Sequence, residues 1–143
     1  MIGNKSVSRM LAAFGLAAFL GVAIYYSYWP DGEPRIAERP LVEVSVPPLA
    51  PIQKQGRTAF EENCAACHGE NAAGRDGSGP PLIHRIYEPN HHGDQAFFLA
   101  AKNGVRQHHW RFGDMPPVDG IEDKEIEHIV AYVRRLQKAN GIN

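Results

Sequence analysis

The longest run of apolar residues lies near the start of the chain. Residues 10–29 carry no charged side chain, and Lys5 and Arg9 precede them. As a helix with a rise of 1.5 Å per residue, about 20 residues reach roughly 30 Å, the thickness of a bilayer's hydrocarbon core. The run ends in tyrosines and Trp29, which suit the membrane interface, whereas a cleaved signal peptide is shorter and ends in small residues. We therefore expect an uncleaved, single-pass anchor in residues 1–29, with its N-terminal end on the cytoplasmic side.

The next segment has a different pattern. Six of residues 30–51 are prolines, which prevents a continuous helix and favours extended backbone. We therefore assign residues 30–50 to a proline-rich linker. A second interpretation stays open, in which the apolar residues of this segment form one strand that lies on the following domain. Those residues are Leu41, Val42, Val44 and Val46.

Two helical patterns bound residues 51–143, which we expect to form one small domain. Near its start, apolar or small residues recur every four positions, at Ile52, Gly56, Phe60 and Cys64. Near its end, a helical period occurs at Ile126, Ile129, Val130, Val133 and Leu136. Acidic residues begin this last pattern and basic residues end it, as the helix dipole prefers, and Gly141 is a natural stop. A shorter helix is expected over residues 94–102, with Asp94 at its start and Gly104 after its end.

Composition narrows the function classes. The chain has 143 residues and a formal net charge of −1, and no basic stripe suggests nucleic acid as a partner. The sequence contains no internal repeat or low-complexity tract. It has only two cysteines, too few for the multiple disulfides that usually stabilise small exported domains. We therefore expect another element to hold the core together.

Both cysteines lie in one pentapeptide, Cys64-Ala65-Ala66-Cys67-His68. Two thiols at this spacing can form a disulfide or half of a zinc site. The zinc interpretation lacks a second cysteine pair, although histidines can substitute, and the disulfide leaves the adjacent histidine unexplained. C-x-x-C-H is the attachment signature of c-type haem, in which each thiol adds across one vinyl group of the porphyrin. We therefore expect one covalently attached haem c, held by Cys64 and Cys67, with His68 as the proximal iron ligand.

With this motif in place, residues 51–143 resemble the class I cytochromes c, specifically the membrane-anchored bacterial kind with one haem. The resemblance implies an all-α cytochrome c fold around the haem, in which the first and last helices cross at a glycine and an aromatic residue. Gly56 and Phe60 are therefore expected to face the last helix. Their expected partners there are Ile129 and Tyr132, with Gly56 permitting close approach.

The resemblance also assigns a role to the turn at residues 79–82, Gly-Pro-Pro-Leu. In the family, the proline carbonyl of this turn accepts a hydrogen bond from Nδ1 of the proximal histidine, which orients the ring. Pro80 is thus expected to orient His68, and Leu82 to pack on the porphyrin.

A methionine loop supplies the second axial ligand in the family. Met115 lies in a Gly-Asp-Met-Pro-Pro sequence that resembles this loop, ahead of the last helix. The other methionines, Met1 and Met10, lie at the cytoplasmic edge of the expected anchor. The resemblance therefore makes Met115 the expected ligand. Trp110 and Phe112 are expected to pack near the haem, because a loop that covers a large planar cofactor suits aromatic residues.

Two pairs of histidines are not explained by the resemblance. They are His91-His92 and His108-His109, and the second pair lies just before the Met115 loop. Exposed loop histidines are commonly solvated, and adjacent side chains need not converge. A surface or structural role, contact with a partner around the haem edge, an alternative haem ligand, and a copper or zinc site therefore remain open.

The resemblance implies an electron-transfer protein rather than an enzyme. The expected function is one-electron transfer in a respiratory or related periplasmic chain, with the haem domain on the periplasmic side of a bacterial inner membrane. Similar anchored cytochromes work between a cytochrome bc complex and a terminal oxidase. Two alternatives stay open: a dedicated haem subunit of a particular dehydrogenase or copper oxidase, and a haem peroxidase or gas sensor if Met115 is labile.

Overall fold

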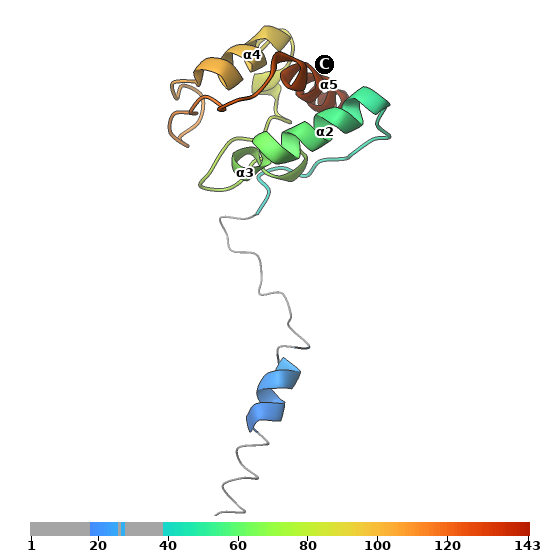
Figure 1. Cartoon of the computed structure of the whole chain (residues 1–143), viewed down its shortest axis with the longest axis vertical. Helices are drawn as coiled ribbons and strands as arrows, with labels where there is room; N and C mark the ends of the chain where they lie inside the picture. Colours follow the sequence, from blue (N-terminus) through green and yellow to red (C-terminus); the bar gives the residue numbers. More distant parts are fainter. Residues whose placement is uncertain (1–17, 26, 28–38) are drawn as a thin grey trace, which may run out of the picture. The chain divides into compact units, whose positions relative to one another are not determined.

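The computed structural model describes residues 18–25, 27 and 39–143, and the chain divides after Arg35 into two units. In the first unit, residues 18–25 and 27 are helical with exposed side chains (Figure 1). The other residues of the predicted anchor at 10–29 lie outside the described part. Within the described part, no helix has both the length and the apolar character that a membrane span requires.

The second unit is built from helices. They are α2 (Pro51–Asn63), α3 (Ala65–His68), α4 (Asp94–Asn103) and α5 (Asp123–Ala139), with the short 3-10 turns η2 (Glu70–Ala72) and η3 (Arg85–Tyr87) between them. Residues 39–143 contain no strand beyond two isolated bridges, Arg75–Gly79 and Val105–Met115. The predicted helical fold of this domain is therefore confirmed. The expected helix at 94–102 is α4, which ends before Gly104, where φ is +72°.

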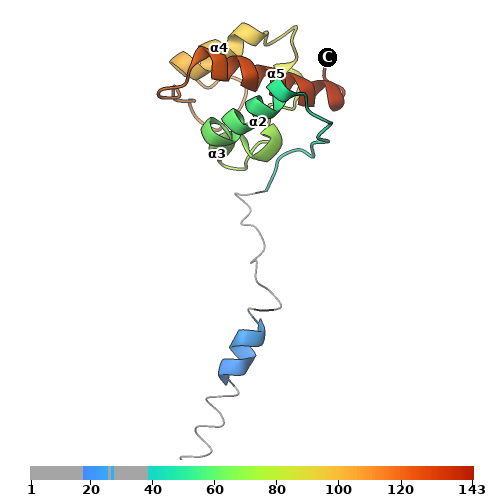
Figure 2. The same cartoon turned by 45° about the vertical axis from the view of Figure 1, so that its right-hand side comes forward.

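The crossing of α2 with α5 forms the centre of the domain, and α4 packs on α5 (Figure 1, Figure 2). Phe60 and Tyr132 meet there with ring centroids 5.8 Å apart, and both are at most 1% exposed. A Cβ atom on Gly56 would lie 1.9 Å from the carbonyl oxygen of His128, so the backbones approach too closely for any side chain. Ile129 is buried in the same core, as the sequence predicts for this crossing.

The helices of the crossing begin at side chains that satisfy free backbone amides. Pro51 is the first residue of α2, a position at which a backbone N–H would have no acceptor within the helix. Gln53 Oε1 accepts a hydrogen bond from the Ala50 amide at 2.9 Å. In α5 the Glu125 carboxylate accepts from the Glu122 amide at 2.8 Å. Both starts follow from local sequence.

Ile52, the first residue of the four-residue period in α2, is 41% exposed. The close approach to α5 occurs at Gly56 and Phe60, which are the buried residues of α2. The first turn of α2 therefore has no buried face.

Residues 39–50, which we assigned to the linker, lie on the domain. The amides of Leu41 and Val42 both donate to the carbonyl of Ala73 at 3.1 Å. Three apolar side chains of the segment pack against the core: Val42, Val44 and Leu49. The backbone is extended without forming a strand. This part of the segment therefore contributes to the core as a single extended chain.

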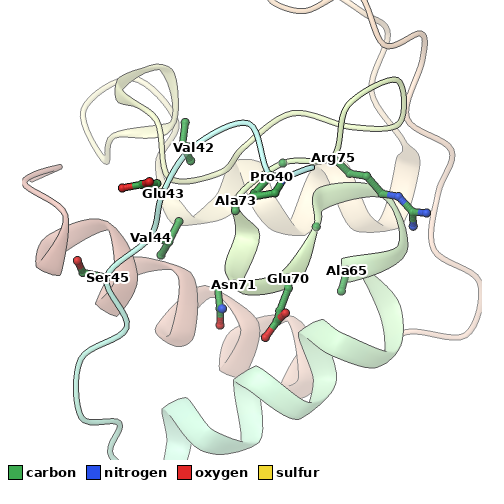
Figure 3. Close-up of a pocket in the computed structure, with 12 residues that line it drawn as sticks. Pro40, Val42, Glu43, Val44, Ser45, Ala65, Glu70, Asn71, Ala73 and Arg75 are labelled. Carbon is green, nitrogen blue, oxygen red and sulfur yellow. The ribbon is translucent and has the colours of Figure 1, made fainter. Parts of the chain in front are cut away.

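A second contact holds the segment at the far end of α5. The Ser45 amide donates to Asn140 Oδ1, and Asn140 Nδ2 donates to the Ser45 carbonyl, both at 2.9 Å. Figure 3 shows the segment beside the loop that follows α3. A groove of about 730 Å³ lies there, and the charged residues in its lining are Glu43, Glu70 and Arg75. None of the predicted haem residues lines this groove.

Candidate functional site

The C-x-x-C-H motif occupies the junction of α2 with α3. The Cys64 amide donates to the Phe60 carbonyl at 2.8 Å, and the His68 amide donates to the Cys64 carbonyl at 2.9 Å. Cys64 and Cys67 are therefore one helical turn apart, a spacing that places both thiols on one side of the chain. Both cysteines and His68 line a cavity inside the domain.

This cavity has a volume of about 520 Å³ and brings together all six predicted haem residues: Cys64, Cys67, His68, Pro80, Leu82 and Met115. They come from α3, the turn after it and the loop before α5. Much of the remaining wall is apolar, with Phe60 from α2 and Ile126 and Ile129 from α5. A largely apolar wall with a few polar groups is typical of a cofactor pocket.

The ring of His68 is oriented by the turn at residues 79–82. Nδ1 of His68 lies 2.9 Å from the carbonyl oxygen of Pro80. Since a carbonyl oxygen only accepts, Nδ1 carries the proton and Nε2 keeps a free lone pair. Burial lowers the pKa of His68, although the Pro80 hydrogen bond opposes the shift. The ring is thus favoured in its neutral form, which can bind a metal.

Gly79 permits this turn to lie against the motif. A Cβ atom on Gly79 would lie 2.6 Å from the carbonyl oxygen of Cys67. The neighbouring proline can therefore reach His68 only because position 79 has no side chain.

The thiol of Cys64 does not resemble a redox-active thiol. Burial, assisted by the neighbouring Cys67, raises the pKa of Cys64 to about 11. Reactive thiols of C-x-x-C motifs have lowered pKa values, because the thiolate is the attacking species. This difference disfavours the dithiol interpretation of the motif.

Met115 lies at the base of a closed loop, residues 105–115. Val105 and Met115 exchange two backbone hydrogen bonds of 2.9 Å each. Within the loop, the Gln107 amide donates to Asp114 Oδ1 at 2.8 Å, and the Gly113 amide donates to Gln107 Oε1 at 2.7 Å. These contacts fix the backbone that carries Met115 at the cavity.

Trp110 and Phe112, expected near the haem, both line the cavity. Nε1 of Trp110 is buried and lies beside the Tyr87 side chain, without a well-formed hydrogen bond among the described residues. The edge of the His84 ring contacts the indole, with centroids 5.0 Å apart. An unpaired buried donor costs free energy, so this position suits a ligand that brings a hydrogen-bond acceptor.

A family comparison identifies the class of protein to which this cavity belongs. The cytochrome c family model matches residues 53–137. The chain belongs to this family. The predicted class, a c-type cytochrome with covalently bound haem c and an electron-transfer function, is thereby confirmed. The cavity fits this cofactor, because its wall combines apolar side chains with two thiols, an imidazole, a thioether and an unpaired indole N–H.

Curated relatives of this cytochrome are oxidase subunits. It is 35% identical over 96 residues to the cbb3-type cytochrome c oxidase subunit CcoP of Azospirillum brasilense, which is 61% of this chain and 29% of that protein. It is 26% identical over 126 residues to subunit FixP of Rhizobium meliloti, 75% of this chain and 42% of that protein. The cytochrome thus spans less than half the length of these relatives. No solved structure matches it.

The two histidine pairs, whose role the sequence left open, converge in the structure. The rings of His91 and His109 have centroids 5.2 Å apart, and those of His92 and His109 are 5.3 Å apart. Desolvation and the neighbouring imidazoles lower the pKa of His109. Local sequence could not predict this convergence, because α4 separates the two pairs along the chain.

Proposed function

We propose that this cytochrome is a one-electron carrier of a respiratory or related periplasmic chain, with His68 and Met115 as the axial ligands of one haem c. When bound, haem c supplies a one-electron couple between ferrous and ferric iron. The observation that supports the proposal is that the C-x-x-C-H motif and the Met115 loop, far apart in sequence, line one largely apolar cavity.

Each residue of the site has a distinct role in this proposal. Cys64 and Cys67 hold the cofactor through thioether bonds. His68 would bind the iron through Nε2, because Nδ1 carries the proton and donates it to the Pro80 carbonyl in a hydrogen bond. Met115 offers a thioether, which raises the reduction potential relative to a second imidazole. His68 and Met115 would both hold the iron, and haem c held in this way would supply electron transfer rather than substrate binding.

We further propose that residues 10–29 anchor the protein in a bacterial inner membrane and that the haem domain lies in the periplasm. The described helical residues of this segment expose apolar side chains, with Phe19 74% and Ile24 56% exposed. An apolar helix of this kind suits a lipid environment better than water. The haem domain of this proposal comprises residues 51–143 together with the packed segment 39–50.

The partners we propose are membrane-bound redox complexes. The relatives named as cbb3-type oxidase subunits support a terminal oxidase as the electron acceptor, and the resemblance to anchored cytochromes supports a cytochrome bc complex as the donor. The same relatives favour a second candidate, a dedicated haem subunit of an oxidase. Co-purification from mild detergent separates them, since a subunit stays with its complex and a carrier dissociates.

The carrier mechanism is tested at Met115 in the full-length protein with its haem attached. The wild-type protein should be six-coordinate and low-spin and should not bind carbon monoxide in the ferrous state. Met115→Ala should open one axial position, so that carbon monoxide binds, and Met115→His should stay six-coordinate at a lower potential. Met10→Leu is the matched control and should behave as the wild type.

Two results would contradict the carrier mechanism. If Met115→Ala kept the wild-type spectrum and potential, another residue would be the ligand. If the wild-type protein bound carbon monoxide readily, Met115 would be labile, and a peroxidase or gas sensor would be the better description.

A further inference from the structure

Four histidines meet at the rim of the haem cavity, although they come from two different loops. His91 and His92 precede α4, whereas His108 and His109 follow it. The ring centroids of His108 and His109 are 4.2 Å apart, and those of His91 and His92 are 4.7 Å apart. His92, His108 and His109 also line the cavity.

Three of these side chains can direct ring nitrogens to a common point. His91, His92 and His109 each offer one nitrogen, and these three atoms lie within 4.8 Å of one another. A tetrahedral metal ion with metal–nitrogen bonds of about 2.0–2.1 Å places its ligand atoms roughly 3.3 Å apart. His91 and His109 are exposed, so small side-chain rotations suffice to close the remaining distance.

In two of the four rings, a hydrogen bond at Nδ1 leaves Nε2 free to bind a metal. Nδ1 of His92 lies 2.6 Å from the Ile86 carbonyl, and Nδ1 of His108 lies 2.8 Å from the Arg106 carbonyl. A carbonyl accepts only, so each Nδ1 carries the proton and each Nε2 keeps its lone pair. Metal-bound histidines typically donate their second ring nitrogen to a carbonyl in this way.

The loop that carries His92 is fixed to α5 through Arg134. The guanidinium of Arg134 donates to the carbonyls of His92 and Tyr87, the latter at 2.7 Å, and forms an ion pair of 2.7 Å with Asp94. The side chain of His92 also contacts the Tyr87 ring, with centroids 5.2 Å apart. The backbone of His92 is therefore held independently of any ion.

The loop that carries His109 is braced as well. The backbone bonds between Val105 and Met115 close its base, and Gln107 and Asp114 cross-link its interior. Two braced loops thus present imidazoles to each other. A binding site that is preorganised before the ligand binds loses less conformational entropy on binding.

The donor set selects the kind of ion. The group consists of imidazoles without a carboxylate, and imidazole suits zinc, copper and nickel, whereas calcium and magnesium require oxygen ligands. We propose that His91, His92 and His109 bind one divalent transition-metal ion of the zinc or copper type.

Such an ion would join the loop before α4 to the loop that carries Met115. It would therefore tie the two loops together at the rim of the haem cavity. This inference does not require Met115 to be an axial ligand, so it stands or fails separately from the carrier mechanism.

Titration calorimetry with zinc chloride tests the site in the full-length protein, purified with its haem, without a polyhistidine tag and after treatment with a chelator. We expect one equivalent of Zn²⁺ to bind and the unfolding temperature to rise. His91→Gln and His109→Gln should each weaken binding by about tenfold or more. Because His91 is exposed and does not line the haem cavity, His91→Gln should retain the wild-type haem spectrum and unfolding temperature in chelator.

The matched control is His128→Gln, which changes a histidine of α5 outside the cluster and should leave zinc binding unchanged. Titration with Cu²⁺ adds a spectroscopic readout, since electron paramagnetic resonance should show coupling to several imidazole nitrogens. The proposal is overturned if the wild-type protein binds no Zn²⁺, or if His91→Gln and His109→Gln bind it as tightly as the wild type.

Discussion

Replacing Gly56 with alanine places a methyl group where α2 and α5 leave no room for one. The new Cβ atom would lie 1.9 Å from the His128 carbonyl oxygen and 3.0 Å from Cβ of Tyr132. Non-bonded heavy atoms prefer about 3.5 Å, so the helices must separate locally by roughly 1.5 Å. The first obstacle is backbone, which cannot rotate away.

The cost follows from two opposing effects. Overpacking a core costs about 1–3 kcal/mol, and a backbone obstacle justifies the upper end of this range. The higher helix propensity of alanine relative to glycine offsets about 1 kcal/mol of this cost. The net loss is therefore about 2 kcal/mol. At about 4–8 °C per kcal/mol for a domain of this size, the unfolding temperature should fall by roughly 8–16 °C.

Thermal unfolding followed by circular dichroism measures this change in the protein with its haem attached. Gly93→Ala is the matched control, because its Cβ atom would meet only the Pro89 carbonyl oxygen at 3.7 Å, an ordinary contact. The unfolding temperature of Gly93→Ala should fall by only a small fraction of the decrease expected for Gly56→Ala. Equal unfolding temperatures for Gly56→Ala and the wild type would refute the close crossing.

Two further predictions concern alkaline stability and the membrane. Burial raises the pKa of Tyr132 to about 12, whereas in the unfolded chain it is about 10. The neutral hydroxyl therefore contributes its full stability below pH 10, and this contribution is lost between pH 10 and 12. Tyr132→Phe loses the hydrogen bond to Asn71 and about 1 kcal/mol at pH 7, but urea midpoints should converge with those of the wild type above pH 10; a constant gap would contradict this assignment. The full-length protein should stay with membranes during alkaline washing, whereas a version starting at Asp31 behind a cleavable signal should be soluble; a mature N-terminus just after Trp29 would exclude the anchor.

The parts of the fold that could be predicted depend on local sequence or on family motifs. The helical periods and the acidic start of the last helix identify α2 and α5, and the spacing of Asp94 and Gly104 identifies α4. The contact of Gly56 and Phe60 with Tyr132 followed from the family resemblance and holds in the structure. The same period includes Ile52, which is 41% exposed, because periodicity alone cannot indicate where along a helix the contact with its partner ends.

The parts that could not be predicted depend on contacts between distant segments. The sequence could not decide whether residues 41–46 form a linker or a strand on the domain. The structure has residues 41–49 on the domain, packed against Ala73 and the core, without a strand. The meeting of the histidine pairs depends on the closure of the Met115 loop and on the hydrogen bonds of Arg134. Neither kind of contact leaves a pattern within a short stretch of chain.

The paired hydrogen bonds between Ser45 and Asn140 have a consequence for how this domain can be joined to other proteins. They fix the segment before α2 to the end of α5, and neither residue lines the haem cavity. A version of the domain that begins at Pro51 would therefore lose this paired contact, together with the packing of Val42, Val44 and Leu49 on the core. A fusion of this domain to another redox protein should therefore begin before Leu41, so that the packed segment is carried along with the cofactor environment.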